Sequence, residues 1–433
     1  MKQIDGNAAR ALVAVVAIGS AAVAAGACSG GQILPPPLPS TTSAGGAGGM
    51  DPSTASSTSS TGGAGGSGGA TASSASTSAG SGTGGSAPTC LDAAAVADVL
   101  TIKDASLCAV ARYDAAEELG FNAPSWGAHG GPLTLRAGMN GTFDLVRWTP
   151  PADTKGALTK QEVNVDGKIP MGAFLGGQAV DVPFFGWTAL AYTGAFPDTK
   201  GELLLVKGSA VDKRYATNGS YATAGISAAN AQGRLLLTGL SNVGDAKAGA
   251  NSLFAADTCG TPAMPALLPG MDATCKAPIT VATWGDSSGP VAVDHAGNAF
   301  TVMSSFDGSQ EARGFDAASI ARGGSPTAGV KLFTIPGFGS NLAALAPTAT
   351  AAGIVAYQPS DGTTFLPQDV LEQRYTVAGG KLAAMGAPTT MLQAATANAL
   401  LYVIVDDQDR LWVGTDKVAP ATGATYVVLA RTP

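Results

Sequence analysis

One short pattern recurs beyond about residue 131 and sets the fold that we expect. Each copy has Asp or Asn, two variable residues and a turn-forming residue, and stands between apolar runs; the copies are Asp198–Leu204, Asn230–Leu236, Asp294–Phe300 and Asp406–Trp412. Asp or Asn caps a turn from its first position, and glycine at the fourth position accepts positive φ without steric cost. Asp409 takes the glycine position in the last copy, and Asp tolerates this conformation better than most residues. Each copy therefore predicts a β-hairpin with a type I turn.

The spacing of the pattern suggests larger units. With two weaker copies, Gly138–Phe143 and Thr350–Val355, the fourth turn position falls at residues 141, 201, 233, 297, 353 and 409. The separations of 60, 32, 64, 56 and 56 residues are compatible with units of about 40 to 60 residues, the range of propeller blades, although the 32-residue step fits poorly. From about Gly131 onward, short strand-forming runs alternate with Gly, Asp, Asn and Pro, which is typical of an all-β protein.

Two of these hairpins resemble a known class of repeats. The segments 289–302 (GPVAVDHAGNAFTV) and 402–414 (YVIVDDQDRLWVG) are similar to repeats of β-propellers of the NHL and two-component-regulator type. The resemblance implies that the hairpins form inner strands of blades. It further implies a β-propeller of six or seven blades over the 344 residues from Cys90 to Pro433. A β-sandwich, or two smaller β domains with the same turn chemistry, is the alternative.

The N-terminus predicts export. Lys2 and Arg10 precede an apolar run that ends in small residues, as in a secretory signal peptide, and this run is too short and too alanine-rich for a spanning helix. It ends in Ala25-Gly26-Ala27-Cys28, which resembles the lipobox of bacterial lipoproteins, with Ala25 where Leu is usual. The resemblance implies a signal peptide over residues 1–27, cleavage before Cys28 and a diacylglycerol on its sulfur. An ordinary signal peptide with an incidental Cys28 is the alternative.

Residues 28–89 predict a disordered tether. They consist almost entirely of Gly, Ala, Ser and Thr after a short proline-rich stub, and such a segment has too little apolar surface to offset the entropy lost on folding. About 60 such residues have a root-mean-square span of ~45 Å. The folded part is then residues 90–433. At its start, the alanine-rich stretch 92–119 predicts helix, with Gly120 as the stop.

The five cysteines fit an oxidising compartment. With Cys28 acylated, an even number remains in an exported chain, which predicts two disulfides among Cys90, Cys108, Cys259 and Cys275. Three pairings are open. We favour the local pairs, Cys90–Cys108 and Cys259–Cys275, because each closes a short loop.

Charge and composition exclude several classes of partner. The chain carries a formal charge of −7, has two histidines and lacks a basic cluster, so nucleic acid and anionic lipid surfaces are poor partners. It contains no C-x-x-C sequence, and neither histidine stands near a cysteine pair, which argues against zinc. Phosphate-loop, dinucleotide and haem-attachment motifs are also missing from residues 90–433. We therefore expect no metal and no cofactor.

Two segments match serine-hydrolase motifs. Gly65–Gly69 satisfies G-x-S-x-G but lies in the predicted tether, without the strand and helix that a nucleophile elbow needs. Gly285–Pro290 resembles the G-D-S-G-G-P signature of chymotrypsin-like proteases, with Ser288 where that family has Gly. The resemblance implies Ser287 as nucleophile and either His129 or His295 as base, although a triad needs close contact between them. The alternative is a loop that leads into a strand at Val291.

Carboxylates and aromatic residues provide the remaining candidates. Asp294, Asp406, Asp407 and Asp409 are of the type that binds a catalytic metal in lactonase-like propellers, but turn capping accounts for Asp294 and Asp406 locally. Large aromatic residues in or beside the predicted strands are expected mostly in the core, with a minority exposed to bind a glycan or a protein; they are Phe184, Phe185, Trp187, Trp284, Tyr357 and Trp412.

The sequence thus predicts a lipid-anchored protein of the cell envelope, either periplasmic or exposed at the surface. Its only membrane contact is the lipid, and its propeller-like domain is a non-catalytic binding or scaffolding module without catalytic, cofactor or metal residues. The alternative is a surface hydrolase, either metal-dependent or serine-dependent through Ser287.

Overall fold

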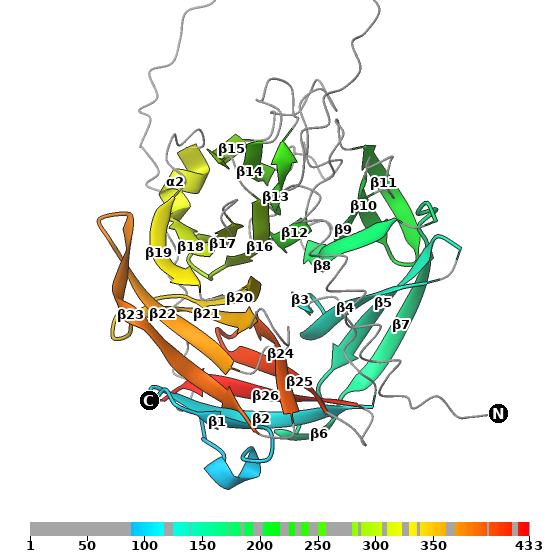
Figure 1. Cartoon of the computed structure of the whole chain (residues 1–433). Coiled ribbons are helices and arrows are strands. Elements are labelled where there is room, and N and C mark those ends of the chain that lie inside the picture. Colours follow the sequence, from blue (N-terminus) through cyan, green and yellow to red (C-terminus); the bar gives the residue numbers. More distant parts are fainter. Residues whose placement is uncertain are drawn as a thin grey trace, which may run out of the picture. The chain divides into compact units, whose positions relative to one another are not determined.

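A computed structural model describes the folded part of the chain (Figure 1). The described residues are 88–116, 124–138, 140–171, 173–182, 186–193, 202–216, 225–229, 235–241, 250–256, 279–284, 287–304, 310–322, 329–335, 338–360, 369–395, 398–417 and 423–432. Nearly all regular structure in these ranges is β-strand, so the predicted all-β class is confirmed.

The strands form six antiparallel sheets, which we number as blades in chain order. Blade 1 comprises β3 (Ser125–Gly127), β4 (Gly131–Ala137), β5 (Thr142–Thr149) and β7 (Thr159–Asp166). Blade 2 comprises β8 (Phe174–Val182), β9 (Trp187–Thr193), β10 (Glu202–Lys207) and β11 (Ala210–Ala216). Blade 3 comprises β12 (Gly225–Ala229), β13 (Leu235–Ser241), β14 (Ala250–Ala256) and β15 (Ile279–Trp284). Blade 4 comprises β16 (Ser287–Val293), β17 (Ala299–Ser304), β18 (Gln310–Phe315) and β19 (Val330–Ile335).

The last two blades include strands from the start of the folded region. Blade 5 comprises β20 (Phe338–Leu345), β21 (Gly353–Ser360), β22 (Asp369–Ala378) and β23 (Lys381–Ala394), with β1 (Leu100–Ile102) at its edge. Blade 6 comprises β24 (Asn398–Val405), β25 (Leu411–Lys417), β26 (Ala424–Arg431) and β2 (Leu107–Ala115), with β6 (Lys155–Ala157) parallel to β2.

The blades form a closed ring. The first strands of successive blades contact one another in the order β3, β8, β12, β16, β20 and β24, and β24 in turn contacts β3 (Figure 1). Repeated four-stranded sheets around a common centre define a β-propeller. The chain is therefore a propeller with six blades in its described part, within the predicted range.

The ring is closed by strands from both ends of the folded region. The N-terminal β2 pairs with the C-terminal β26 from Leu107↔Arg431 to Ala115↔Ala424. Just before it, residues 90–106 cross to blade 5, where β1 pairs with the last residues of β23. We call residues 90–106 the strap. Its first residue forms the Cys90–Cys108 disulfide, which confirms that predicted pair; Cys28, Cys259 and Cys275 lie outside the described residues.

The predicted helix over residues 92–119 is wrong. Its described part holds only a short 3-10 turn, η1 (Ala93–Ala95), capped by Asp92, followed by strands β1 and β2. Helix propensity is a weak prior, and here the pairing of β2 with β26 and β6 overrides it. Nearly alternate residues of β2 are fully buried, which is the period of a strand. A single short helix, α2 (Ala317–Arg322), is present among the described residues.

The sheets explain the irregular spacing of the turn pattern. Residues 141 and 201 lie between the second and third strands of blades 1 and 2, whereas residues 233, 297, 353 and 409 lie between or beside the first and second strands of blades 3 to 6. The 32-residue step marks the move from one turn of a blade to another, not a missing unit. The interpretation of Gly353 as a positive-φ turn glycine is wrong, because it begins β21; a Cβ there would lie 2.2 Å from the ring of Tyr375.

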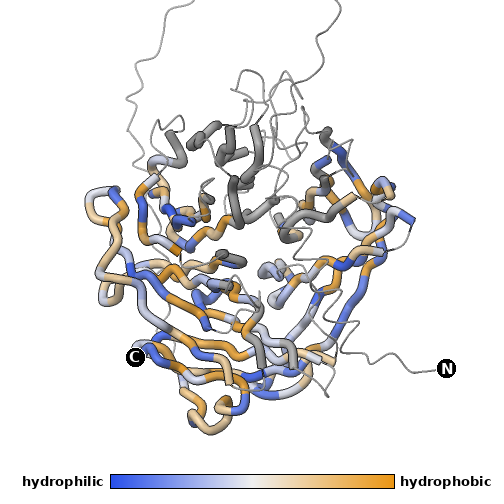
Figure 2. The backbone as a smooth tube through the Cα atoms, in the orientation of Figure 1, coloured by the Kyte–Doolittle hydropathy of each residue, from blue (hydrophilic) through white to orange (hydrophobic). Residues whose placement is uncertain are grey.

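Apolar residues fill the spaces between adjacent blades. One buried cluster joins blades 1 and 2, another joins blades 4 and 5, and two more extend from blade 6 to its neighbours on either side. Figure 2 shows hydrophobic and hydrophilic residues following one another along the strands. Trp187, Tyr357 and Trp412 are buried, as predicted for core aromatics, while the side chains of Phe184, Phe185 and Trp284 lie outside the described set.

Candidate functional site

The sequence-predicted candidates gather at one end of the propeller. Each blade repeats the same up-and-down order, so the turn between its first and second strands emerges at the same end. We call these the inner turns; the described ones span residues 127–131, 294–298, 346–352 and 406–410. His129, Asp294, His295, Asp406, Asp407 and Asp409 all belong to them. The geometry of these side chains decides whether they are available for chemistry.

Asp294 is occupied by its own turn and by blade 5. Its Oδ1 accepts the backbone N–H of Asn298 at 2.8 Å, and its Oδ2 accepts from Asn298 Nδ2 at 2.7 Å and from the hydroxyl of Tyr375 at 2.5 Å. Gly297 at the fourth position has φ 85°, as the pattern predicted. The carboxylate is buried, and the burial of Tyr375 next to it raises the pKa of the tyrosine hydroxyl. Asp294 therefore holds a turn and joins two blades.

Asp406 is still more fully engaged. Its Oδ1 accepts the backbone N–H groups of Gln408 and Arg410, both at 2.9 Å. Its Oδ2 accepts from Arg410 Nε at 2.6 Å and from the indole N–H of Trp412 at 2.9 Å. The side chain is fully buried. Four donors saturate a carboxylate, so Asp406 has no free electron pair for a metal or a proton transfer.

Asp409 and His295 join blades 4, 5 and 6. Asp409 has φ 57° and accepts the backbone N–H of Ala346 through Oδ1 at 3.1 Å; burial raises the pKa of its carboxyl group. His295, in the turn of blade 4, has Nε2 2.9 Å from the backbone oxygen of Asp406 in blade 6. Both side chains thus connect neighbouring turns, and Asp407 is the exposed carboxylate of this group.

His129 packs against its own hairpin. Its Nε2 lies 3.2 Å from the backbone oxygen of Trp148, and a Cβ at Gly127 would lie 2.3 Å from the imidazole ring. Burial lowers the pKa of His129, so the neutral ring is favoured. Beside it, Asp181 of blade 2 accepts the backbone N–H of Ala128 at 2.9 Å. This turn therefore joins blades 1 and 2 as the acidic turns join blades 4, 5 and 6.

Ser287 is separated from both histidines. It is the first residue of β16, whereas His295 follows the last residue of that strand, about 20 Å away at ~3.3 Å per residue. His129 lies in an inner turn at the same end as His295. The chymotrypsin-like arrangement of base and nucleophile is therefore not formed by these residues. The expectation that Gly285–Pro290 is a loop leading to Val291 is wrong for residues 287–290, which lie in β16, while residues 285 and 286 lie outside the described residues.

The described residues include no group of three His, Cys, Asp or Glu side chains that could hold a metal ion. None of their helices is long and apolar enough to span a membrane.

Three contributors to the inner turns were missed by the sequence analysis. The hydroxyl oxygen of Tyr375 also lies 3.1 Å from the backbone oxygen of Leu345, and Arg431 donates to the backbone oxygens of Ala346 and Ala352, at 2.7 Å each. Asn298 follows the turn pattern by one residue and pairs with Asp294. Only Asn298 has a local signal; Tyr375 and Arg431 come from distant strands whose pairing the sequence does not reveal.

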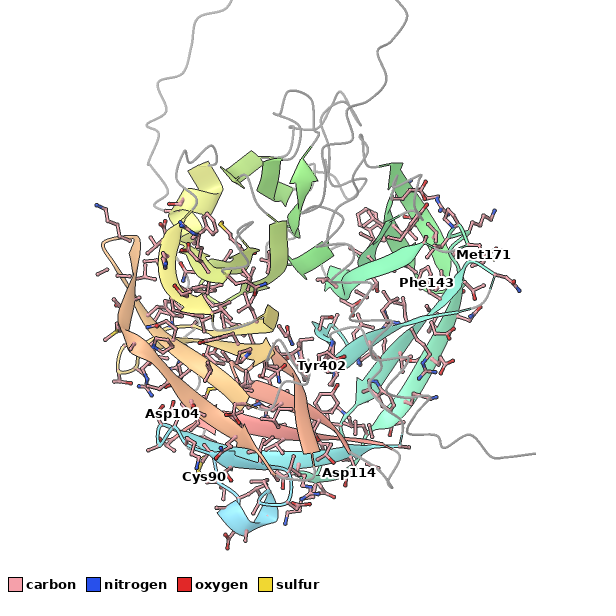
Figure 3. The ribbon with its side chains drawn as sticks, in the orientation of Figure 1. Cys90, Asp104, Asp114, Phe143, Met171 and Tyr402 are labelled. Carbon is pink, nitrogen blue, oxygen red and sulfur yellow. A yellow bond between two sulfur atoms is a disulfide. The ribbon has the colours of Figure 1, made fainter. Side chains whose placement is uncertain are left out.

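Half-buried aromatics mark a second feature of the inner strands. Trp126 lies on β3, and Tyr402, which Figure 3 labels, lies on β24; these two strands are neighbours where the ring closes. Trp126 packs against the buried Trp412 with ring centroids 5.0 Å apart. Both side chains belong to the partly buried edge of the cluster between blades 6 and 1. They are aromatic surface on the inner wall that solvent reaches in part.

Comparisons with family models and with curated proteins give no match. Among solved structures, the chain is similar to the PQQ-bound form of an aldose sugar dehydrogenase from Streptomyces coelicolor, at 17% identity and TM-score 0.45, over 76% of this chain and 97% of that one. It is also similar to the SapL1 lectin in complex with alpha methyl fucoside (12%, TM-score 0.40, 73% and 97%) and to a protein of unknown function from Dyadobacter fermentans (12%, 0.39, 76% and 100%). These likenesses are too distant to carry an argument about function.

Proposed function

We propose that this propeller is a non-catalytic binding or scaffolding module held at the cell envelope by a lipid on Cys28. One observation carries the non-catalytic part: apart from the exposed Asp407, the candidate carboxylates and histidines of the described inner turns are engaged in structural hydrogen bonds. Asp294 and Asp406 together accept seven hydrogen bonds from protein donors. Their chemistry stabilises turns, and fold alone does not imply catalysis.

The half-buried aromatics support a ligand that presents a flat apolar face. Trp126 and Tyr402 stand on adjacent first strands, and aromatic faces bind sugar rings or apolar side chains of a protein. The proposed ligands are therefore a glycan or a protein of the envelope. Kinship with NHL and two-component-regulator propellers belongs to the proposal too, since it rests on the hairpins of Asp294 and Asp406.

Anchoring rests on the sequence of the first 90 residues. The lipobox-like Ala25-Gly26-Ala27-Cys28 is followed by the Gly-, Ala-, Ser- and Thr-rich segment to residue 89. A lipidated cysteine with several acyl chains anchors stably, whereas a single chain would be marginal. The proposed arrangement is thus signal peptide, acylated Cys28, tether and propeller, located in the periplasm or at the cell surface.

Metabolic labelling tests the anchor. Full-length chain produced in a bacterial host with a labelled fatty acid should carry the label, and Cys28→Ala should remove it. Cys259→Ala is the matched control, because it also deletes one cysteine but should keep the label. Labelling that survives in Cys28→Ala, or is absent from the wild type, would refute the anchor and leave the propeller function untouched.

Activity and binding assays on the same full-length protein test the module. We expect no hydrolysis of esters, lactones or peptides above that of Ser287→Ala, with or without added Ca²⁺. On an array of immobilised glycans and envelope proteins, Tyr402→Ala should weaken retention at least tenfold. Met171→Ala, which truncates a side chain that is 95% exposed after β7, should leave retention unchanged. Turnover lost specifically in Ser287→Ala or gained with Ca²⁺ would overturn the non-catalytic proposal.

A further inference from the structure

Two buried carboxyl groups meet where the strap crosses blade 5. Glu372, on β22, is 4% exposed, and the side chain of Asp104, in the strap turn before β2, is 6% exposed. Arg374 donates to both oxygens of Asp104 at 2.9 Å and to Glu372 Oε1 at 3.2 Å. Ser106 donates to Asp104, and Thr389 of β23 donates to Glu372 Oε1 at 3.3 Å. Figure 3 labels Asp104 at this position near the chain's C-terminus.

This cluster carries a net negative charge unless one of its two carboxyl groups is protonated. The charged groups that face Glu372 are Asp104 from the strap and Arg374 from its own strand, while β23 and the start of β2 contribute only the hydroxyls of Thr389 and Ser106. Two carboxylates and one guanidinium leave a buried net charge of −1. Glu372 Oε2 is buried and receives no donor, which is the environment of a protonated oxygen.

The pKa values of Glu372 and Asp104 are shifted in opposite directions. Burial, followed by the neighbouring Asp104, raises the pKa of Glu372 to about 7. Although burial opposes it, hydrogen bonds from Ser106 and the charge of Arg374 lower the pKa of Asp104. When one proton is present, Glu372 therefore holds it and Asp104 remains ionised.

Blade 4 contains a matched cluster without this feature. Glu311 and Arg313 occupy the third strand with the same spacing, and Glu311 faces Thr334 across the sheet as Glu372 faces Thr389. There the additional charged group is Lys331, whose Nζ lies 2.6 Å from Glu311 Oε1. Its hydrogen bond, together with Arg313, lowers the pKa of Glu311. Deeper burial and the carboxylate supplied by the strap together distinguish Glu372 from Glu311.

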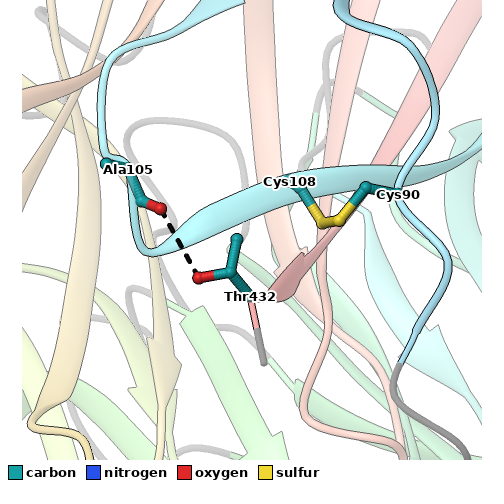
Figure 4. Close-up of a disulfide and its surroundings, with 4 residues drawn as sticks. All are labelled: Cys90, Ala105, Cys108 and Thr432. Carbon is teal, nitrogen blue, oxygen red and sulfur yellow. Dashed lines mark hydrogen bonds between the residues drawn. A yellow bond between two sulfur atoms is a disulfide. The ribbon is translucent and has the colours of Figure 1, made fainter.

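We infer that a proton on Glu372, beside the ionised Asp104, holds the strap on blade 5 and makes the docking of the strap sensitive to pH. The turn that holds Asp104 also carries the closing contacts of the C-terminus: Thr432 donates its backbone N–H to Ser106 and its hydroxyl to the backbone oxygen of Ala105 (Figure 4). Loss of the proton to solvent places two like charges in contact beneath this turn. Strap and C-terminus then loosen together.

The direction of the effect follows from proton linkage. In the open strap Glu372 has an ordinary pKa of 4.5, so opening releases a proton between that value and about 7. The closed form therefore weakens as pH rises through this interval and changes little above it. A gap of this size corresponds to a rise on the order of 100-fold in the opening constant between pH 4.5 and 7.5.

Hydrogen–deuterium exchange of the full-length protein measures the opening. After correction for intrinsic exchange, peptides covering residues 100–107 should lose protection by on the order of 100-fold from pH 4.5 to 7.5. Glu372→Gln keeps the shape and a donor but cannot ionise, so its exchange should be independent of pH. Glu311→Gln in the matched cluster should behave as the wild type. An infrared band of a protonated carboxyl at pH 6, lost in Glu372→Gln, would identify the proton directly.

Asp104→Asn provides a second test of the inference in case Glu372→Gln fails to fold. It removes the second carboxylate, so only burial still raises the pKa of Glu372 and the pH dependence should be clearly smaller than in the wild type. Wild-type protection that stays level between pH 4.5 and 7.5 would overturn the inference. The same pH dependence in Glu372→Gln or Asp104→Asn would also overturn it, because the responsible group would then lie elsewhere.

Discussion

Asp406→Asn tests whether the acids of the inner turns are structural. The amide keeps one oxygen, which still accepts the backbone N–H groups of Gln408 and Arg410. Its NH₂ group replaces Oδ2 and then faces two donors, Arg410 Nε and the indole N–H of Trp412. The substitution therefore changes no volume and removes only the acceptor at Oδ2.

The magnitude follows from the burial of the two donors. Trp412 is fully buried, and an unsatisfied buried N–H costs about 1–3 kcal/mol. The guanidinium of Arg410 is 29% exposed and turns to solvent, so the loss of its pair adds less than about 1 kcal/mol. We expect a total of about 3 kcal/mol. With ~0.7 kcal/mol per degree for about 340 folded residues, the Tm should fall by about 4 °C.

Thermal unfolding followed by circular dichroism measures this shift. Asp407→Asn is the matched control, because its side chain is exposed in the same turn and surface changes remain within about 0.5 kcal/mol. An Asp406→Asn protein with an unchanged Tm would refute the structural assignment. The carboxylate would then be dispensable for folding, as many catalytic acids are, and the hydrolase alternative would gain support.

Three further predictions concern other parts of the fold. Replacing Cys108 with Ser opens the loop that begins at Cys90 and should cost about 3 kcal/mol of unfolding free energy, measured against wild type in urea. Gly353→Ala should lower the free energy of unfolding by more than about 2 kcal/mol, since its Cβ would lie 2.2 Å from the Tyr375 ring. A Tm equal to that of the wild type would contradict this, because it would show that β21 and β22 move apart at little energetic cost. Because the pKa of Glu372 is raised, its contribution to stability should fall as pH rises from 4.5 to about 7, and urea unfolding of Glu372→Gln should lack this decrease.

The fold was predictable where local chemistry determines it. The turns of Asp294 and Asp406 require a capping side chain and, three positions later, a residue of positive φ. Both features can be recognised in a short stretch of the sequence. The same reasoning failed at residues 92–119, where alanine favours helix and only the pairing with β26 decides for strand. It also failed at Gly353, where the reason for glycine is a tyrosine on the neighbouring strand.

For the candidate site, only the contacts within a single turn could be predicted from the sequence. Turn capping by Asp294 was expected, but its bond to Tyr375 joins residues 81 positions apart. His295 was weighed as a catalytic base, yet its partner is a backbone oxygen two blades away. Such contacts depend on the order in which blades close the ring, and no short pattern in the sequence encodes that order.

The two Glu–Arg pairs show how position in the ring changes the chemistry of the same Glu-x-Arg spacing. Glu311 and Glu372 each precede an arginine by two residues, on the third strand of a blade and opposite a threonine. In blade 4 the fourth strand supplies Lys331, and the pKa of the glutamate falls. In blade 5 the glutamate is buried and the strap supplies Asp104, and both raise the pKa of Glu372, to about 7. Among the described sheets the strap pairs with blade 5, so the Glu–Arg pair of blade 4 has no counterpart to Asp104. Asp104→Lys replaces the negative charge of the strap with a positive one, so it should lower the pKa of Glu372 as Lys331 lowers that of Glu311. A carboxyl infrared band that persists at pH 6 would contradict this explanation.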